Sequence, residues 1–140
     1  MTAWVALTSF GRRHRLQPRA NVTFDVQALA DPADVDELRS LSGLDDRVVR
    51  YVLDQSLAQA MLDVLVAAIV LQLHNTARRP EDEVRVAVFC EDGQRLSVVM
   101  VDALAALMCA ARPDIVVSTD HLDLHRRTDQ CRSGEGGEAP

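Results

Sequence analysis

Aromatic residues are scarce in this chain of 140 residues: Phe, Tyr and Trp together make up 4% of it. A hydrophobic core must therefore come from aliphatic side chains, and these are abundant, since 48% of the residues are hydrophobic. Proteins that bind single-stranded RNA stack its bases on aromatic rings, so the scarcity of such rings counts against that mode of binding. The length is typical of one domain.

Cysteine is also sparse, with three residues at Cys90, Cys109 and Cys131. An odd number without regular spacing does not form a disulfide framework, so we expect a reducing, cytoplasmic location. The cysteines form no C-x-x-C pair and are not interleaved with the four histidines at ligand spacing. We therefore expect neither a metal site nor a cofactor.

Positive charge is in deficit, because the formal net charge is −6. Broad binding to nucleic acid needs a surplus of Lys and Arg, so the net charge argues against it, although residues 12–15 form a local basic cluster. Long apolar runs are missing as well. The longest, Val64 to Leu71, is much shorter than the roughly 20 residues that span a bilayer, and no signal peptide begins the chain, so we expect no membrane association.

Strand and helix patterns alternate along the chain, which is typical of an α/β domain. Apolar and β-branched residues predict strands at residues 3–9, 22–26, 84–90 and 115–118. Apolar residues at helical spacing predict one long helix from Asp45 or Asp46 to about Asn75, and a second helix over residues 98–111 that Ser97 caps. The sequence thus predicts a single α/β domain over residues 1–127, with a small, largely parallel or mixed sheet flanked by helices.

The remaining segments are interpreted by composition. Residues 31–34 include Pro32 and either break regular structure or open a short helix. Residues 121–127 form a short basic amphipathic element, and residues 128–140, rich in Gly, Ser and Glu, are expected to be a disordered tail. The last part of the long helix is apolar on nearly all sides, which predicts burial on several sides or a homo-oligomer interface.

The loop from Cys90 to Ser97 joins the most apolar strand to a helix. Ligands of parallel sheets bind at the carboxyl ends of the strands, and a helix N-terminus there favours an anion. Arg95 can add a guanidinium, and the same setting would favour a thiolate at Cys90. The alternative interpretation of Cys90 is a small buried hydrophobic residue.

Cysteine phosphatases carry an arginine after a cysteine and five intervening residues. In this chain Leu96 holds that position, Arg95 comes one residue early, and Glu91 and Asp92 place negative charge where a phosphate would lie. The sequence therefore disfavours a phosphatase. The loop also lacks the G-x-x-x-x-G-K-[ST] pattern of a P-loop, and we expect a domain that is not an enzyme.

Five short segments follow one another in a consistent order and spacing. They are Thr8-Ser9-Phe10-Gly11, Thr23-Phe24-Asp25-Val26, the run from Leu38 to Asp45, the loop with Cys90, Gly93, Ser97 and Val98, and His121-Leu122-Asp123-Leu124. They resemble, in turn, the Ser-Phe-Gly turn, the Phe-Asp-Val-Arg strand, the Leu-Arg-x-Leu-Thr-Gly-Leu-Asp turn, the Cys-Thr-Gly-Gly-x-His-Arg-Ser-Val loop and the His-Arg-Asp-Leu segment of RapZ-type proteins. The likeness to the C-terminal domain of this RNase adapter family spans roughly residues 5–127.

The resemblance implies an α/β domain that self-associates and binds a phosphorylated amino sugar. In some members it also implies binding of a small regulatory RNA and its delivery to a ribonuclease. We do not expect this chain to supply the P-loop nucleotide-binding domain that precedes this domain in the family. A separate P-loop protein is therefore one expected partner.

The chain departs from the family pattern around the presumed pocket. Glu91-Asp92 replaces Thr-Gly, Arg95-Leu96 replaces His-Arg, and Gln27 and Leu122 each replace an arginine. Each change removes positive charge or adds negative charge, for which Arg39, Arg95, Arg13 and His14 can partly compensate.

Three hypotheses follow for the function. The first, which we favour, is a non-enzymatic ligand-sensing or adapter domain for a small polar or phosphorylated ligand, such as a phosphosugar or a nucleotide-like anion. Its predicted contacts are Ser9, Gly11, Arg13, His14, Arg39, Cys90, Glu91, Asp92, Gly93, Arg95 and Ser97. The second is an RNA-binding adapter that uses Arg12, Arg13, Arg15, Arg126 and Arg127. The third is an oligomerisation module whose original site has decayed.

Overall fold

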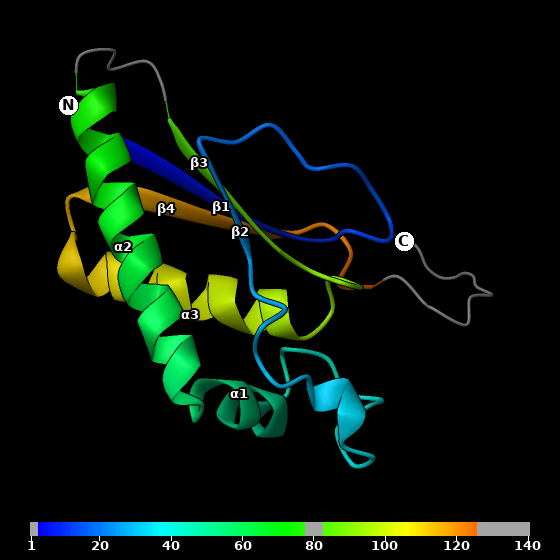
Figure 1. The fold of residues 1–140 in the computed structure, drawn as a ribbon. Coiled ribbons are helices and arrows are strands. Elements are labelled where there is room, and N and C mark those ends of the chain that lie inside the picture. Colours follow the sequence, from blue (N-terminus) through cyan, green and yellow to red (C-terminus); the bar gives the residue numbers. More distant parts are fainter. Residues whose placement is uncertain (1–2, 78–82, 126–140) are drawn as a thin grey trace.

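The structure is a computed structural model and describes residues 3–77 and 83–125 (Figure 1). Its strands are β1 (Ala3–Gly11), β2 (Val22–Asp25), β3 (Val84–Cys90) and β4 (Ile115–His121), and its helices are α1 (Asp46–Leu53), α2 (Ser56–Thr76) and α3 (Leu96–Ala111), with a short 3-10 helix, η1 (Pro32–Asp34). The predicted α/β class is confirmed, and the short helix at Pro32 follows one of the two predicted alternatives.

The four strands form one sheet in the order β2-β3-β1-β4, and all three pairings are parallel. Every β-to-β connection must therefore cross over the sheet, as strand–helix alternation predicts. The register aligns Gly11 of β1 with Cys90 of β3, so these two strands end at the same level. Because β2 and β4 also run parallel, four chain segments emerge at the carboxyl edge.

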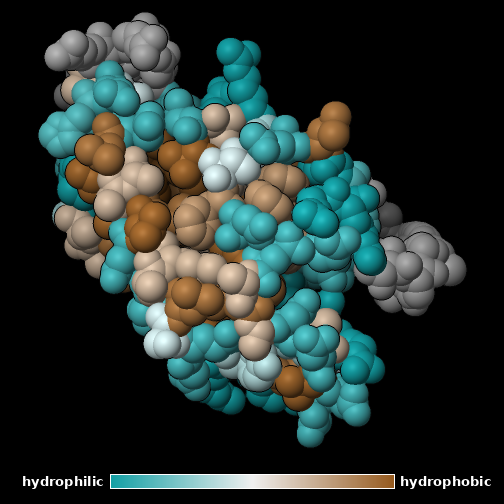
Figure 2. Space-filling view, viewed as in Figure 1, coloured by the Kyte–Doolittle hydropathy of each residue, from teal (hydrophilic) through white to brown (hydrophobic). Residues whose placement is uncertain are grey.

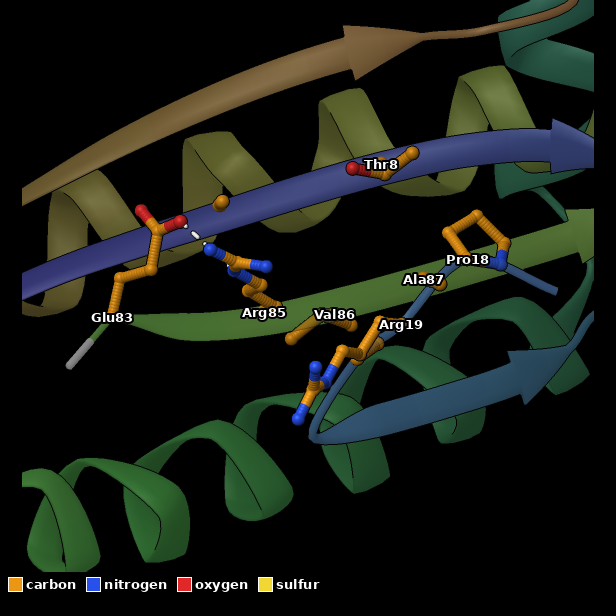
Figure 3. A pocket seen from close by; sticks show the side chains of 9 residues that line it. Thr8, Pro18, Arg19, Glu83, Arg85, Val86 and Ala87 are labelled. Atoms are coloured by element: carbon orange, nitrogen blue, oxygen red, sulfur yellow. Dashed lines mark hydrogen bonds and ion pairs between the residues drawn. The ribbon is translucent and has the colours of Figure 1, made fainter.

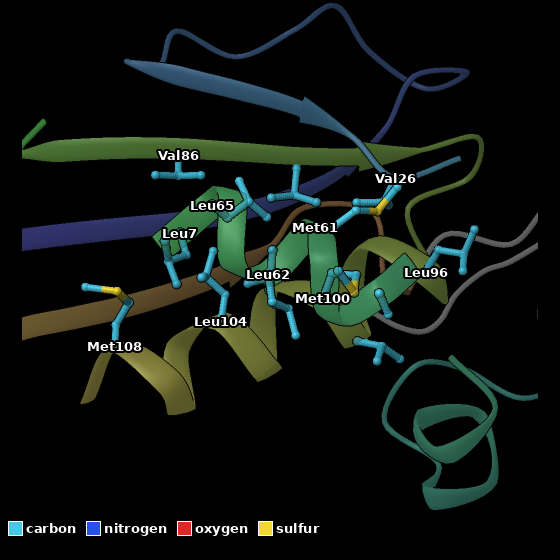
Figure 4. Packing of buried hydrophobic residues seen from close by; sticks show 14 of the residues in the cluster. Leu7, Val26, Met61, Leu62, Leu65, Val86, Leu96, Met100, Leu104 and Met108 are labelled. Atoms are coloured by element: carbon cyan, nitrogen blue, oxygen red, sulfur yellow. The ribbon is translucent and has the colours of Figure 1, made fainter. Parts of the chain in front are cut away.

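The helices cover one face of the sheet (Figure 1). Along β1, Val5 and Leu7 point toward the helices and are each 1% exposed, while Trp4 points to the other face and is 51% exposed. Leu7 and Val86 of the sheet meet Leu62 and Leu65 of α2 and Leu104 and Met108 of α3 (Figure 4). The core is therefore aliphatic and sulfur-containing, as the scarcity of aromatics requires.

The long helix predicted from Asp45 to Asn75 is two helices, which corrects the sequence interpretation. Asp45 is the N-cap of α1, and its carboxylate accepts a hydrogen bond from the Arg47 N–H at 2.9 Å. The chain then turns at Gln55, whose backbone is extended (φ −77°, ψ 129°). The Gln55 amide bonds the backbone N–H and C=O of Ala30 at 2.8 and 3.1 Å. A tertiary contact thus interrupts a pattern that is helical on both sides of it.

Further boundaries differ from the prediction, since β1 continues to Gly11 rather than ending at Ser9, and β2 ends at Asp25 rather than at Val26. Helix α3 begins at Leu96, and its N-cap is Arg95 without a side-chain cap bond, so Ser97 is not the cap. Strand β4 continues to His121, because its ladder with β1 runs as far as Ser9. The predicted amphipathic element therefore starts as strand and turn, and its last residues, Arg126 and Arg127, lie outside the described residues, as does the predicted tail 128–140.

One helix of the described chain, α2, is long and apolar enough to cross a membrane by length and composition. The apolar run from Val64 to Leu71, taken alone, is too short to indicate this property. Six α2 residues nevertheless lie in the core against the sheet and α3, which is how a core helix of a globular domain also behaves. Length and apolarity are therefore weak grounds for a membrane role here.

Candidate functional site

The loops that follow β1 and β3 lie side by side at the carboxyl edge of the sheet. The Arg12 N–H donates to the Cys90 carbonyl and the Arg13 N–H to the Glu91 carbonyl, each at 3.0 Å. These bonds continue the parallel ladder beyond the end of both strands. As a result, the basic segment of residues 12–15 lies beside the loop after β3. The sequence predicted this arrangement, because the ends of parallel strands lie at the same edge of a sheet.

Two glycines allow these loops to approach each other closely. A Cβ atom on Gly11 would lie 2.3 Å from the Asp92 carbonyl carbon, and one on Gly93 would lie 2.5 Å from the Gly11 nitrogen. Gly93 also has φ of +74°, which favours glycine. Both glycines were predicted as site residues, and both hold the backbone of the site in place.

Asp123 links the segment that follows β4 to the segment that follows β1. It is fully buried and accepts a hydrogen bond from the Gly11 N–H at 2.9 Å. Arg15 binds both of its carboxylate oxygens, at 3.0 and 2.7 Å, and donates to the Leu122 carbonyl at 3.3 Å. The hydrogen bond to Asp123 raises the pKa of Arg15. Arg15 is thus committed to holding the turn between β1 and the end of β4.

Glu91 lies between two guanidinium groups. Its Oε1 accepts from Arg12 Nε at 3.1 Å, and its Oε2 lies 3.8 Å from Arg13 Nε. Gln27, which follows β2, donates to Oε1 at 3.4 Å. All these ionic side chains are half-exposed or more.

The other two predicted cations are engaged elsewhere. Arg95 pairs with Asp92 at 2.5 Å and donates to the carbonyls of Arg39 and Leu41. It therefore links the loop after β3 to the segment of residues 39–41. Arg39 directs its guanidinium to Asp36 at 2.8 Å. The structure therefore does not bring the Arg39 side chain to the loops after β1 and β3.

Cys90 is buried and bonded to its own loop. Its Sγ lies 3.2 Å from Ser97 Oγ and accepts a hydrogen bond from the Gly93 N–H, also at 3.2 Å. Burial raises the pKa of the Cys90 thiol, although the contact with Ser97 acts in the opposite direction. The expected favoured thiolate is therefore wrong, and the alternative, a small buried residue, describes Cys90.

A polar chain that the sequence interpretation missed runs from Ser9 through His121 to Asp102. Ser9 Oγ lies 2.7 Å from His121 Nδ1, and His121 Nε2 lies 2.9 Å from Asp102 Oδ1. Ser9 is fully buried, so this chain anchors the end of β4 to β1 and α3 rather than exposing a nucleophile. Only the parallel register of β1 and β4, which pairs Ser9 with His121, could have indicated it.

His14 follows the same turn and has an unusual feature. Its backbone N–H donates to the Gly11 carbonyl at 2.9 Å. Its ring Nε2 is buried without a hydrogen-bond partner among the described residues. Buried polar nitrogens are nearly always paired, so this atom can accept a further partner.

A cavity of about 230 Å³ lies on the sheet face opposite the helices (Figure 3). Ala6, Thr8 and Ala87 form its floor, Arg19 borders it from the loop after β1, and Arg85 pairs with Glu83 at 3.0 Å beside it. None of the predicted site residues lines this cavity. The described residues contain no group of three or more His, Cys, Asp or Glu side chains that could hold a metal ion.

The fold and these loops define a class of protein: a small parallel α/β domain whose polar segments gather at the carboxyl edge of the sheet. The family model of the RapZ C-terminal domain matches residues 3–125, nearly all of the described chain. The chain therefore belongs to the RapZ C-terminal domain family, and the resemblance seen in the sequence is confirmed.

Curated relatives agree with this assignment. The chain is 36% identical over 122 residues to a nucleotide-binding protein of Bifidobacterium adolescentis, covering 87% of this chain and 39% of the relative. It is 33% identical over 134 residues to one of Staphylococcus epidermidis (96% and 42%) and 31% identical over 123 residues to one of Listeria monocytogenes (88% and 41%). The chain thus spans about two fifths of their length. All three relatives are named nucleotide-binding proteins.

Proposed function

We propose that this domain is a non-enzymatic ligand-sensing or adapter domain that binds a small phosphorylated or otherwise polar ligand at the carboxyl edge of its sheet. One observation carries the proposal: backbone bonds fix Arg12 and Arg13 beside the loop after β3, where two guanidiniums face one carboxylate. Arg12, Arg13 and Glu91 form what we call the basic corner, and together they carry a net positive charge in a protein of net charge −6. His14 lies in the same turn, with its ring Nε2 buried and without a hydrogen-bond partner among the described residues.

The predicted ligand residues divide into two groups on this proposal. Arg13, His14 and Glu91, joined by Arg12, are placed to touch a ligand. All the others except Arg39, whose guanidinium binds Asp36, support the loops: Ser9, Gly11, Cys90, Asp92, Gly93, Arg95 and Ser97 have bonds or close contacts within the site. Phosphosugars and nucleotides are the first ligands to test, because the relatives are named nucleotide-binding proteins.

A thermal-shift screen with phosphosugars, nucleotides, amino sugars and inorganic phosphate tests the proposal. Ligands that bind only the folded state raise the melting temperature. We expect a hit whose shift disappears in Arg13→Ala and persists in Arg50→Ala, an exposed arginine on α1. If no compound shifts the wild-type protein at any concentration, the ligand-binding proposal is wrong.

We also propose a cytoplasmic adapter that self-associates through α2. Leu57, Val64 and Leu71 are spaced seven residues apart on this helix and are 44%, 56% and 65% exposed. Apolar side chains gather over α2 in Figure 2. The remaining three fifths of the relatives' length leaves room for a further domain or a separate P-loop protein as partner.

An RNA-binding adapter is the alternative proposal, and it would rest mainly on Arg12 and Arg13. Arg15 is occupied by Asp123, and Arg126 and Arg127 lie outside the described residues. Binding to RNA through phosphates would weaken steeply with salt, which a filter-binding series at several salt concentrations measures.

A further inference from the structure

At the basic corner, the carboxylate of Glu91 lies between the guanidinium groups of Arg12 and Arg13. Each of its two carboxylate oxygens faces a different guanidinium, at 3.1 Å for Arg12 and 3.8 Å for Arg13. The amide of Gln27 adds a neutral donor at 3.4 Å. Two guanidiniums and an amide around one anion are the recognition geometry of a bound carboxylate or phosphate.

The backbone assembles this corner before any ligand arrives. The Arg13 N–H bonds the Glu91 carbonyl at 3.0 Å, so the two side chains start from neighbouring backbone positions. The Val26 N–H bonds the Phe89 carbonyl at 3.1 Å, which holds the segment carrying Gln27 beside the same loop. The carboxylate is therefore present at a high local concentration, as a tethered group is.

The neighbouring carboxylates are not available for this role. Asp92 is bound by Arg95 and Asp123 by Arg15, and both of these acids are largely or fully buried. Glu91 is 46% exposed, and its partners Arg12 and Arg13 are 60% and 48% exposed. Exposed ion pairs contribute only about 0–1 kcal/mol, so a stronger anion can displace Glu91.

We propose that Glu91 is a tethered competitor that sets the anion selectivity of the site; this inference rests on the proposed function. A monoanionic carboxylate offers Arg12 and Arg13 nothing that Glu91 does not already provide. A dianionic phosphate ester brings a second charge and displaces it. Glu91 therefore makes the site prefer a dianionic phosphate ester to a carboxylate, and makes it bind that ester more weakly than the two arginines alone would.

Titrations of inorganic phosphate and of acetate into the full chain test this inference, at fixed ionic strength and near neutral pH. Glu91→Gln removes the charge and keeps the shape, and we expect it to bind phosphate about tenfold more tightly than wild type. It should also gain measurable binding of acetate. The matched control Glu37→Gln makes the same change in net charge at an exposed acid before α1 and should behave as wild type.

Two further variants separate the explanations. Glu91→Thr, which removes the charge with a different shape, should give the same gain. Adding Arg13→Ala to Glu91→Gln should abolish it. Circular dichroism melting verifies that each variant folds, which we expect because Glu91 is half-exposed.

The possible results differ in what they overturn. If wild type and Glu91→Gln bind phosphate equally, the tethered-competitor inference fails and the proposed function stands. A gain of the same size in Glu37→Gln would show an effect of net charge alone, and it would also overturn the inference. If neither wild type nor any variant binds a phosphate compound, the inference is wrong, and so is the proposed function as far as it concerns a phosphorylated ligand.

Discussion

Asp123 is the one charged side chain that the described part of the chain buries completely. Its carboxylate joins the turn after β1 to the end of β4 through Gly11 and Arg15. A buried charge left with unsuitable partners costs much more than an exposed one. This residue matches the aspartate of the family's His-Arg-Asp-Leu segment, and the structure explains its position by architecture rather than by ligand contact.

Replacing Asp123 by Asn should lower the free energy of unfolding by about 3 kcal/mol, because Arg15 loses its counter-ion and one carboxylate oxygen becomes a donor. Urea unfolding near pH 7 measures the change. Asp36→Asn, which removes the exposed pair with Arg39, should cost less than about 1 kcal/mol and is the matched control. Equal losses in the two variants would contradict this role of Asp123.

Cys90 gives a prediction for alkaline pH. Since burial raises its pKa in the folded state, the neutral thiol stabilises the fold fully below the pKa of an unfolded thiol. Above that pKa the Cys90 thiol of the unfolded chain ionises, while the thiol of the folded chain stays neutral. The stabilising contribution of the neutral thiol is therefore lost as pH rises toward the pKa of the folded state. Between about pH 7 and pH 10, wild type should therefore lose more stability than Cys90→Ala. Urea unfolding at both pH values checks this, and parallel losses would show that Cys90 does not titrate in this way.

Residue types near one another in the chain were predictable, whereas partners far apart were not. Cys90, Glu91 and Gly93 follow directly from a buried strand, and the sequence placed them correctly in the loop. Ser9 and His121, by contrast, are 112 positions apart and meet only because β1 and β4 are neighbours in the sheet. Pattern and spacing do not contain that register, so the roles of His121 and Asp123 became visible only in the structure.

At the scale of elements, the two strand-end loops behave as one unit. The turn at Gly11 and the turn at Gly93 touch through backbone atoms, which leaves no space for a side chain in either. The ladder bonds from Arg12 and Arg13 depend on this contact. The position of the basic corner is thus decided by two glycines.

Gly93→Ala should destabilise the protein by about 2 kcal/mol or more, since the residue has a positive φ and its Cβ would meet backbone that cannot move aside. It should also reduce ligand binding, because Arg13 would lose its place. Thermal melting and the phosphate titration measure the two effects. Ser40→Ala, at an exposed position, is the control. A variant as stable as wild type would contradict the close packing of the loops.

Element boundaries show where local pattern stops being informative. Strand β3 ends and begins as predicted, because seven residues of nearly continuous apolar character have one stable arrangement in a central strand. The break at Gln55 could not be predicted, since the apolar spacing continues through it. Ala30, a residue 25 positions earlier, determines it by accepting and donating hydrogen bonds.

At the scale of the whole molecule, the two faces of the sheet differ. One carries all the helices, while the other exposes Trp4 and the cavity over Ala6 and Thr8. The outward side of α2 adds a second apolar surface. The fold class followed from strand–helix alternation, but which surfaces stay uncovered depends on how the helices are distributed.

Self-association through α2 predicts a melting temperature that rises with protein concentration. Val64→Glu should remove that dependence with little loss of stability in the monomer, because the side chain is already 56% exposed. Gln59→Glu adds the same charge elsewhere on the helix and should leave it intact. Sedimentation velocity measures the mass directly. A wild-type protein that sediments as a monomer at every concentration would contradict the proposed self-association.

The central place of β1 in the sheet has a consequence for how the chain folds. Of the four strands, β1 is synthesised before both of its neighbours in the sheet, because Val5 pairs with Val84 on one side and with Val117 on the other. Contacts between residues so distant in sequence are slow to form. During synthesis, β1 therefore stays without its sheet partners until Val84–Cys90 has been made. Unpaired strand edges in such an interval favour aggregation.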